Sequence, residues 1–141
     1  MISSELLFLI NLNKLQSVIS RKFDSLSVHG LGFNDFVILY ILSTSSESKM
    51  RRIDLAEKIG LTASGITRLL NPLEKIGLVA REINKRDARV SYVVITEVGK
   101  KIFEEAQTSA ESITKEILPA KKSKSLQTVS QFLSELGGNI Q

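Results

Sequence analysis

Residues 52–69 constrain the fold more strongly than any other part of this chain. Ala56 is small where two short helices must cross closely, and Gly60 lies where the chain must turn, because glycine reaches positive φ without a Cβ clash. Apolar residues recur at helical spacing on both sides of this turn and predict a small shared core: Leu55, Ile59, Leu61, Ile66 and Leu69. The pattern predicts a helix-turn-helix, which lays one helix into a DNA groove. An ordinary helical hairpin in a bundle is the alternative.

The outward face of the second predicted helix carries side chains that form hydrogen bonds. Arg68 could bridge two acceptors of a guanine, while Ser64 and Thr67 can reach bases or phosphates. Asn71 is a further candidate, although Pro72 beside it leaves the direction of its side chain open. A solvated polar face is the alternative interpretation.

The net charge of +4 is concentrated in the middle third of the chain. Residues 49–95 carry ten basic and five acidic side chains, whereas residues 1–48 carry three and four, and residues 96–141 carry six of each. A local excess of positive charge favours a polyanionic partner. A solvated basic face is common, but this one contains the predicted helix-turn-helix, so double-stranded DNA is the expected partner.

Composition excludes several other classes of protein. The 141 residues fit one domain, with or without extensions, and the absence of cysteine excludes disulfides and thiolate metal sites. His29 is the only histidine and is interpreted as a helix-end residue, so no metal or other cofactor is expected. No glycine-rich phosphate loop or clustered histidine–acid pair indicates an enzyme. Without a long apolar run or a basic signal region, the chain is expected to be cytoplasmic and without a membrane partner.

The predicted elements are mostly helical, with one small hairpin. Asn34 can cap the second helix, Thr62 the helix that follows the turn, and Thr96 the long helix after the hairpin. Pro72 is expected to kink or loosen the last turn of its helix. In order, the sequence predicts helices over 5–28 and 34–44, a polar loop over 43–49, a helix-turn-helix over 51–76, strands over 78–83 and 90–95, and helices over 97–117 and 122–136, with Gly77, Pro119 and Gly137 as stops.

Two further groups of basic residues flank the predicted helix-turn-helix. Arg51 and Arg52 lie where a helix begins, and positive charge there opposes the helix dipole. Either they contact phosphate, or the chain tolerates a small cost, and the sequence leaves both open. On the other side, the hairpin tip over 84–89 is strongly charged and forms a wing, in which Lys85 and Arg86 are expected to meet phosphates.

This order of elements resembles the MarR family of winged helix-turn-helix transcription regulators. The similarity is strongest over about residues 30–105, and the outer helices match in pattern only. It is carried by Leu55-Ala56-Glu57-Lys58-Ile59-Gly60-Leu61, Ile66-Thr67-Arg68-Leu69-Leu70, Leu73-Glu74-Lys75-Ile76-Gly77-Leu78-Val79, Asp87-Ala88-Arg89 and Thr96-Glu97-Val98-Gly99. The last two motifs are the more specific ones.

The resemblance implies a homodimer with three segments. Residues 1–30 would form an N-terminal dimerisation helix, residues 31–100 the winged helix-turn-helix domain, and residues 101–141 the C-terminal dimerisation helices. The apolar surplus of the outer helices fits this division, because one small domain could not hide it. The alternative is that both outer segments pack back on their own chain.

The resemblance also implies a role for each site residue. Ser64, Thr67 and Arg68 match positions that face the major groove. Arg89 matches the arginine that enters the minor groove, and Asp87 the acid that holds it by a charge-assisted bond. A narrow A·T-rich groove would attract Arg89, because it concentrates negative potential.

The implied function is sequence-specific binding of a pseudo-palindromic operator, as a repressor, with release by a small aromatic or anionic ligand. Such a ligand would enter the crevice between the dimer helices and the DNA-binding lobe, where location alone points to His29, Phe33 and Tyr40. One alternative is a DNA binder that has no ligand. Another is a winged-helix module for protein–protein interaction without specific DNA binding.

Overall fold

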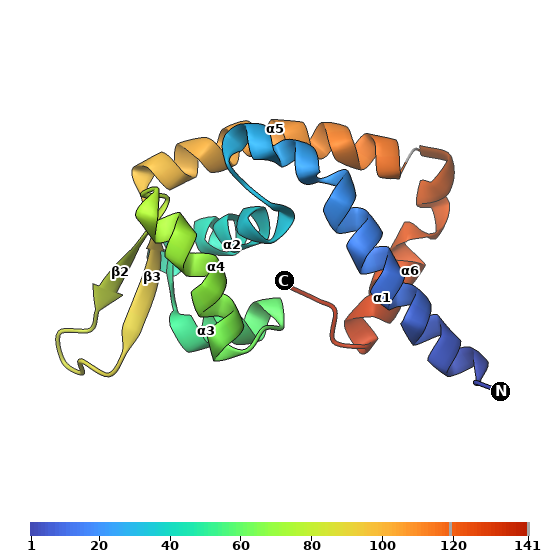
Figure 1. The fold of residues 1–141 in the computed structure, drawn as a ribbon, viewed down its shortest axis with the longest axis horizontal. Coiled ribbons are helices and arrows are strands. Elements are labelled where there is room, and N and C mark those ends of the chain that lie inside the picture. The colour runs from blue at the N-terminus through green and yellow to red at the C-terminus, as the bar shows by residue number, and fades with distance from the viewer. Residues whose placement is uncertain (119, 141) are drawn as a thin grey trace.

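The computed structural model describes residues 1–118 and 120–140 and has one helical lobe, one small sheet and two outlying helices (Figure 1). This confirms the predicted fold class, mainly α with a small β-hairpin. The elements in chain order are α1 (Ser4–Lys22), α2 (Phe33–Thr44), β1 (Lys49–Arg51), α3 (Arg52–Ile59), α4 (Ala63–Lys75), β2 (Val79–Ile83), β3 (Ser91–Ile95), α5 (Glu97–Ile117) and α6 (Leu126–Glu135). Short 3₁₀ turns cover Asp24–His29, Ser46–Ser48 and Ala120–Ser125.

The lobe is built around α2, as its nearly continuous apolar sequence predicts. The side chains at its centre are at most 1% exposed: Ile38, Leu39, Ile41 and Leu42. Against them lie the inward residues of α3 and α4 and of the inner face of the sheet: Leu55, Ile66, Leu70, Leu73, Val93 and Ile95. The inward apolar residues of the predicted helix-turn-helix therefore form one side of the domain core. The outer faces of α4 and of the hairpin are left uncovered by the rest of the chain.

The sheet has three strands, one more than predicted. β3 lies in the middle and pairs antiparallel with both β1 and β2. The helix end predicted at residue 44 is confirmed, so the polar segment expected over 43–49 is shorter at its start, and Lys49 at its end already belongs to β1. A strand of three residues has too little sequence for its own signal, and it forms here because β3 supplies the hydrogen bonds.

Helix ends follow local chemistry, with three corrections. The first helix ends at Lys22 rather than near 28, and a 3₁₀ turn follows it. Asn34 does not cap α2, because the helix already begins at Phe33, and the Asp35 carboxylate accepts a bond from the Gly32 N–H at 2.8 Å. Pro72 lies inside α4, which nevertheless continues to Lys75. The last helix begins at residue 126 rather than 122, and the stop expected at residue 119 lies outside the described residues.

The caps predicted at two threonines are confirmed. Thr62 accepts a bond from the Gly65 N–H at 3.1 Å and begins α4, and Thr96 accepts one from the Gly99 N–H at 3.0 Å and begins α5. Gly60 and Gly77 adopt positive φ of 82° and 80° at the ends of α3 and α4. These signals fix the length and direction of α4.

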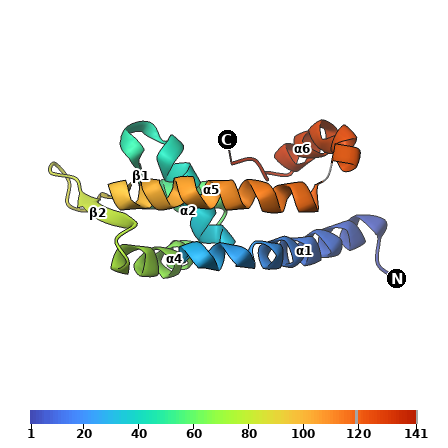
Figure 2. The same cartoon turned by 90° about the horizontal axis from the view of Figure 1, so that it is seen from above.

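The outer helices leave their apolar residues exposed in the single chain. Neither α1 nor α6 has a buried residue, and Phe8 and Phe132 meet edge-to-face with ring centroids 5.7 Å apart. Two views place α6 and the N-terminal end of α1 at the opposite end of the molecule from the wing (Figures 1 and 2). Within residues 1–118 and 120–140, no helix combines the length and apolarity needed to cross a membrane.

Candidate nucleic-acid interface

The outer face of α4 presents the polar residues expected to face a DNA groove. Ser64, Arg68 and Asn71 are exposed, and Thr67 is half-buried. The Thr67 hydroxyl donates to the Ala63 carbonyl at 2.9 Å, so its proton is already used within the helix. The Ser64 hydroxyl lies 3.2 Å from Thr62 Oγ1, whereas the exposed Arg68 guanidinium presents donors that can reach a base or a phosphate.

Arg52 lies against α4 rather than projecting into solvent. Its Nη2 donates to Thr67 Oγ1 at 2.7 Å, and its Nη1 lies 3.9 Å from Glu74 Oε1. Its side chain is only 20% exposed. Arg52 therefore joins α3 to two positions of α4 that lie about two helical turns apart, and it helps to set the rotation of α4. Arg51 behaves differently, because it is half-exposed and its nearest acid, Asp54, is 4.0 Å away.

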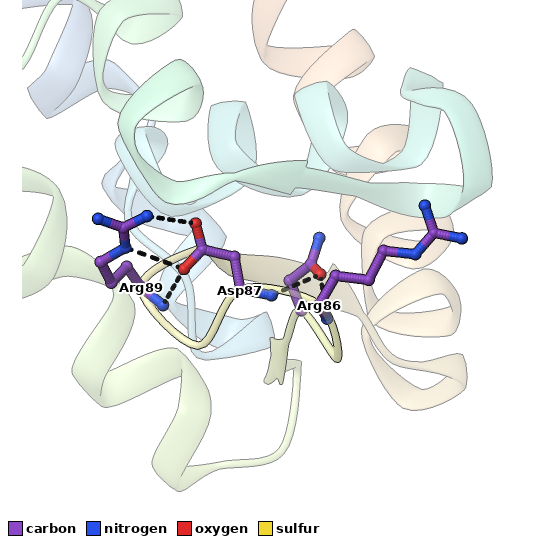
Figure 3. Close-up of polar contacts among 4 residues, drawn as sticks. Arg86, Asp87 and Arg89 are labelled. Carbon is purple, nitrogen blue, oxygen red and sulfur yellow. Dashed lines mark hydrogen bonds and ion pairs between the residues drawn. The ribbon is translucent and has the colours of Figure 1, made fainter.

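The hairpin tip is an ordered turn built on Asn84 and Asp87 (Figure 3). Asn84 Oδ1 accepts bonds from the N–H groups of Arg86 and Asp87, at 2.8 and 3.2 Å. The Asn84 N–H donates to the Val90 carbonyl at 3.0 Å. Sequence reasoning did not single out Asn84, although asparagine in a hairpin loop is a turn signal.

Asp87 holds Arg89 by three hydrogen bonds. Arg89 donates from Nε to Oδ1 at 3.0 Å, from Nη2 to Oδ2 at 3.1 Å, and from its backbone N–H to Oδ1 at 3.0 Å (Figure 3). The Arg89 side chain is nevertheless 91% exposed. The side-chain bonds, and then the backbone bond, hold the pKa of the Asp87 carboxyl below its ordinary value, and they raise the pKa of Arg89. The pair therefore stays charged throughout the neutral range.

The other wing cations are oriented differently. Arg86 points away from the Asp87–Arg89 pair (Figure 3). Lys85 and Arg86 are both exposed, as contacts to phosphates require.

A hollow of about 330 Å³ separates the wing from the helix-turn-helix. It is lined by Arg51, Arg52, Ile53, Ala63, Ile66, Thr67, Arg89, Val90 and Ser91. Three arginines, two of them consecutive at the start of α3 and one from the wing, therefore meet around one concave surface, which also includes the first turns of α4. A convex polyanionic strand matches such a surface in shape and in charge.

The residues suggested for a ligand crevice do not form one cluster. His29 Nε2 lies 2.9 Å from Ser109 Oγ on α5, which ties the 3₁₀ turn before α2 to that helix. Phe33 stacks on Phe23 with centroids 4.1 Å apart, and Tyr40 lies 6.4 Å from the Phe103 ring. His29 and Tyr40 therefore lie against α5, whereas Phe33 packs on Phe23, the residue that follows α1.

The fold and the surface together define a winged helix-turn-helix protein. Comparison with known proteins narrows this class. Residues 33–91 match the model of the MarR family. The HTH-type transcriptional regulator YdgJ of Bacillus subtilis is 26% identical over 138 residues, which cover 98% of this chain and 82% of that protein.

Solved structures share the same fold. The organohalide-sensing regulator RdhR-CbdbA1625 bound to 2,4-dichlorophenol superposes with a TM-score of 0.84 at 18% identity, over 96% of this chain and 80% of that one. Sco3205, a MarR family regulator of Streptomyces coelicolor in complex with DNA, has a TM-score of 0.78 at 20% identity, over 96% and 89%. Residues 33–91 therefore carry a domain of the MarR family, and YdgJ, which matches along nearly the whole chain, is an HTH-type transcriptional regulator.

Proposed function

We propose that this chain binds double-stranded DNA as a homodimer and acts as a repressor at a pseudo-palindromic operator. The observation that carries the proposal is the wing tip, where Asp87 holds an almost fully exposed Arg89 in one orientation. An exposed arginine that is fixed before binding has less conformational entropy to lose when a groove receives it. The complex of Sco3205 with DNA, formed by a protein of the same fold, supports this interpretation.

The residues of α4 would read the operator in the major groove. Arg68 can bridge two acceptors of a guanine, and Ser64 and Asn71 can donate to bases or phosphates. Thr67 has a narrower role, because its proton is used by Ala63 and it can only accept a hydrogen bond from a base. Two such helices in a dimer would meet the duplex about one turn apart, roughly 34 Å.

The remaining cations would position the protein on the backbone. Arg89 would enter the minor groove, while Lys85, Arg86 and Arg51 would neutralise phosphates. These contacts carry little sequence information but make affinity strongly dependent on salt.

Dimerisation is supported by the exposed apolar residues of the outer helices. Leu6, Leu9 and Ile10 on α1 are each about half exposed, as are Val129 on α6 and Leu136, the residue that follows this helix. A hollow of about 440 Å³ between these helices is lined mainly by apolar side chains, including Phe8 and Phe132. A contiguous apolar surface of this kind is typical of an interface. Residues 1–30 and 101–141 would then form the dimer, and residues 31–100 the DNA-binding lobe.

A small aromatic or anionic effector would regulate this binding. RdhR-CbdbA1625, which shares the fold, has been solved with 2,4-dichlorophenol bound. A ligand that binds more tightly to one spacing of the two lobes shifts the dimer toward that spacing. Release from DNA follows if that spacing does not match the groove period.

The test begins with selection of bound sequences from a random duplex pool, followed by anisotropy titrations over a range of salt. Size-exclusion chromatography with light scattering should give twice the mass of one chain. Arg89→Ala and Arg68→Ala should each weaken binding by about tenfold or more. Lys115→Ala, which removes the same charge at the far end of α5, is the control and should change binding less than about twofold. If the protein binds no duplex of any sequence in dilute buffer, the proposal is refuted and a protein–protein module is favoured.

A further inference from the structure

Lys49 links the two outer strands of the sheet across the middle strand. Its Nζ donates to Glu82 Oε1 on β2 at 2.8 Å and lies 3.3 Å from Glu47 Oε2. The same ammonium lies 5.0 Å from the centre of the Tyr92 ring on β3, within cation–π range. The bonds to Glu82 and then to Glu47 raise the pKa of Lys49, so the link stays charged at neutral pH.

The register of the sheet makes this link diagonal. Lys49 is opposite Val94 and Glu82 is opposite Tyr92, so the contact passes over two residues of β3. Its members lie on the face of the sheet away from the core, because the alternate residue Val93 is only 2% exposed. The link therefore contributes nothing to the packed core.

The turn before β1 adopts a costly backbone conformation that brings Glu47 to Lys49. Glu47 and Ser48 both have a φ of 57°, the positive range that residues other than glycine rarely adopt. Such conformations persist only where the surroundings enforce them, and they cluster at positions with a function. Here the turn places a second carboxylate against the Lys49 ammonium.

The location of the link gives it a mechanical role. β1 leads directly into α3, since Arg51 is both its last residue and the cap residue of that helix. β2 and β3 carry the wing and Arg89. Because β1 pairs with β3 through only three residues, the backbone ladder alone is a short hinge between the helix-turn-helix and the wing.

We propose that Glu47, Lys49 and Glu82 form a clasp that fixes the angle of the wing against the helix-turn-helix and so positions Arg89 in the minor groove. The inference rests on the proposed DNA binding. The three residues are positioning residues, and none of them needs to contact DNA. The clasp acts on orientation more than on stability, because the side chains of Glu47 and Glu82 are 72% and 50% exposed and surface ion pairs stabilise little.

Glu82→Gln separates positioning from simple charge. The substitution makes each protomer more positive by one, so electrostatics alone predicts equal or tighter binding to the selected operator. The clasp predicts the opposite, a loss of about three- to tenfold, because the wing must be ordered on binding. Glu57→Gln makes the same charge change at an exposed position of α3 outside the clasp, and it should bind as wild type or more tightly. Melting temperatures of both variants should equal that of wild type.

A double-mutant cycle with Arg89→Ala tests whether the clasp acts on DNA binding through Arg89. At a salt concentration low enough for Arg89→Ala to bind measurably, adding Glu82→Gln should have no further effect, because the side chain that the clasp positions is gone. Operator binding by Glu82→Gln that equals or exceeds wild type would overturn the proposal. The proposal would also be overturned if Glu82→Gln reduced operator affinity by the same factor in wild type and in the Arg89→Ala variant. Failure of wild type to bind any duplex would instead refute the proposed function itself.

Discussion

Gly99 is the position where one added methyl group should cost the most for its size. Gly99 is the third residue of α5, where the start of that helix approaches the chain entering the wing. A Cβ built on it would lie 2.1 Å from the Leu78 carbonyl oxygen and 2.9 Å from Ile95 Cγ1. Since carbon–oxygen contacts are ordinarily at least about 3.3 Å, one of the two backbones must move by about 1 Å. The Leu78 carbonyl cannot move freely, because it accepts the Thr96 N–H at 3.1 Å.

The expected cost of Gly99→Ala follows from these contacts. Overpacking costs about 1–3 kcal/mol, and a weakened backbone hydrogen bond adds about 1 kcal/mol. Replacing glycine by alanine in a helix returns about 1 kcal/mol. The net loss in the free energy of unfolding is about 1–3 kcal/mol, or roughly 4–12 °C in melting temperature for a chain of this size.

Gly65→Ala is a matched control, because Gly65 is also the third residue of its helix and also donates its N–H to a threonine cap. There the nearest atom to an added Cβ is Thr62 Oγ1 at 3.2 Å, the end of a side chain that can shift. The control should change stability by less than about 1 kcal/mol. Urea titrations measure the free energy of unfolding of both variants. They are made at one fixed protomer concentration, because dimerisation would make stability depend on concentration. A Gly99→Ala protein as stable as Gly65→Ala would refute the argument.

Three further outcomes are expected. Burial raises the pKa of Asp35 despite its bond from Gly32, so its contribution to stability falls as pH rises above 3.8; Asp35→Asn, which does not titrate, should gain stability relative to wild type between pH 4 and 7 in urea midpoints. Arg52→Met should weaken operator binding, because the guanidinium holds Thr67, but it should not change how steeply the logarithm of the binding constant falls with the logarithm of salt concentration. A slope smaller by about one per protomer would indicate a phosphate contact of Arg52 instead. Phe132→Glu should halve the mass seen by light scattering, and an unchanged mass would exclude α6 from the interface.

Sequence reasoning succeeded where the signal is local. Thr62 and Thr96 cap helices through bonds to residues three positions away, and Gly60 and Gly77 end helices through their own φ. The hairpin followed from two β-rich runs separated by a short charged loop. Such features depend on a few neighbouring residues, so they can be read before the fold is known.

The failures depend on distant partners or on competing local chemistry. β1 exists because β3 lies beside it, more than forty residues later in the chain. Asn34 had the right chemistry for a cap, but the Asp35 carboxylate reached back to Gly32 and the helix began earlier.

The candidate site divides in the same way. The pattern of polar residues located the α4 face, and the family resemblance supplied the roles of Asp87 and Arg89. Neither revealed that Arg52 bonds to Thr67 fifteen residues away, or that Lys49 lies between two acids. Those contacts exist only after α3, α4 and the strands have packed. The assignment of individual residues to DNA remains a prediction.

The length of α5 has a geometric consequence for operator recognition. Its 21 residues form one uninterrupted helix of about 31 Å, with the wing attached near one end and α6 beyond the other (Figure 1). A tilt of about 5° at the far end moves the near end by about 3 Å, close to the rise of one base pair. In the proposed dimer the same displacement would occur in both protomers. If each lobe moves with its α5 as one body, a rotation of this size would be enough to bring the two α4 helices into or out of register with the grooves of the duplex.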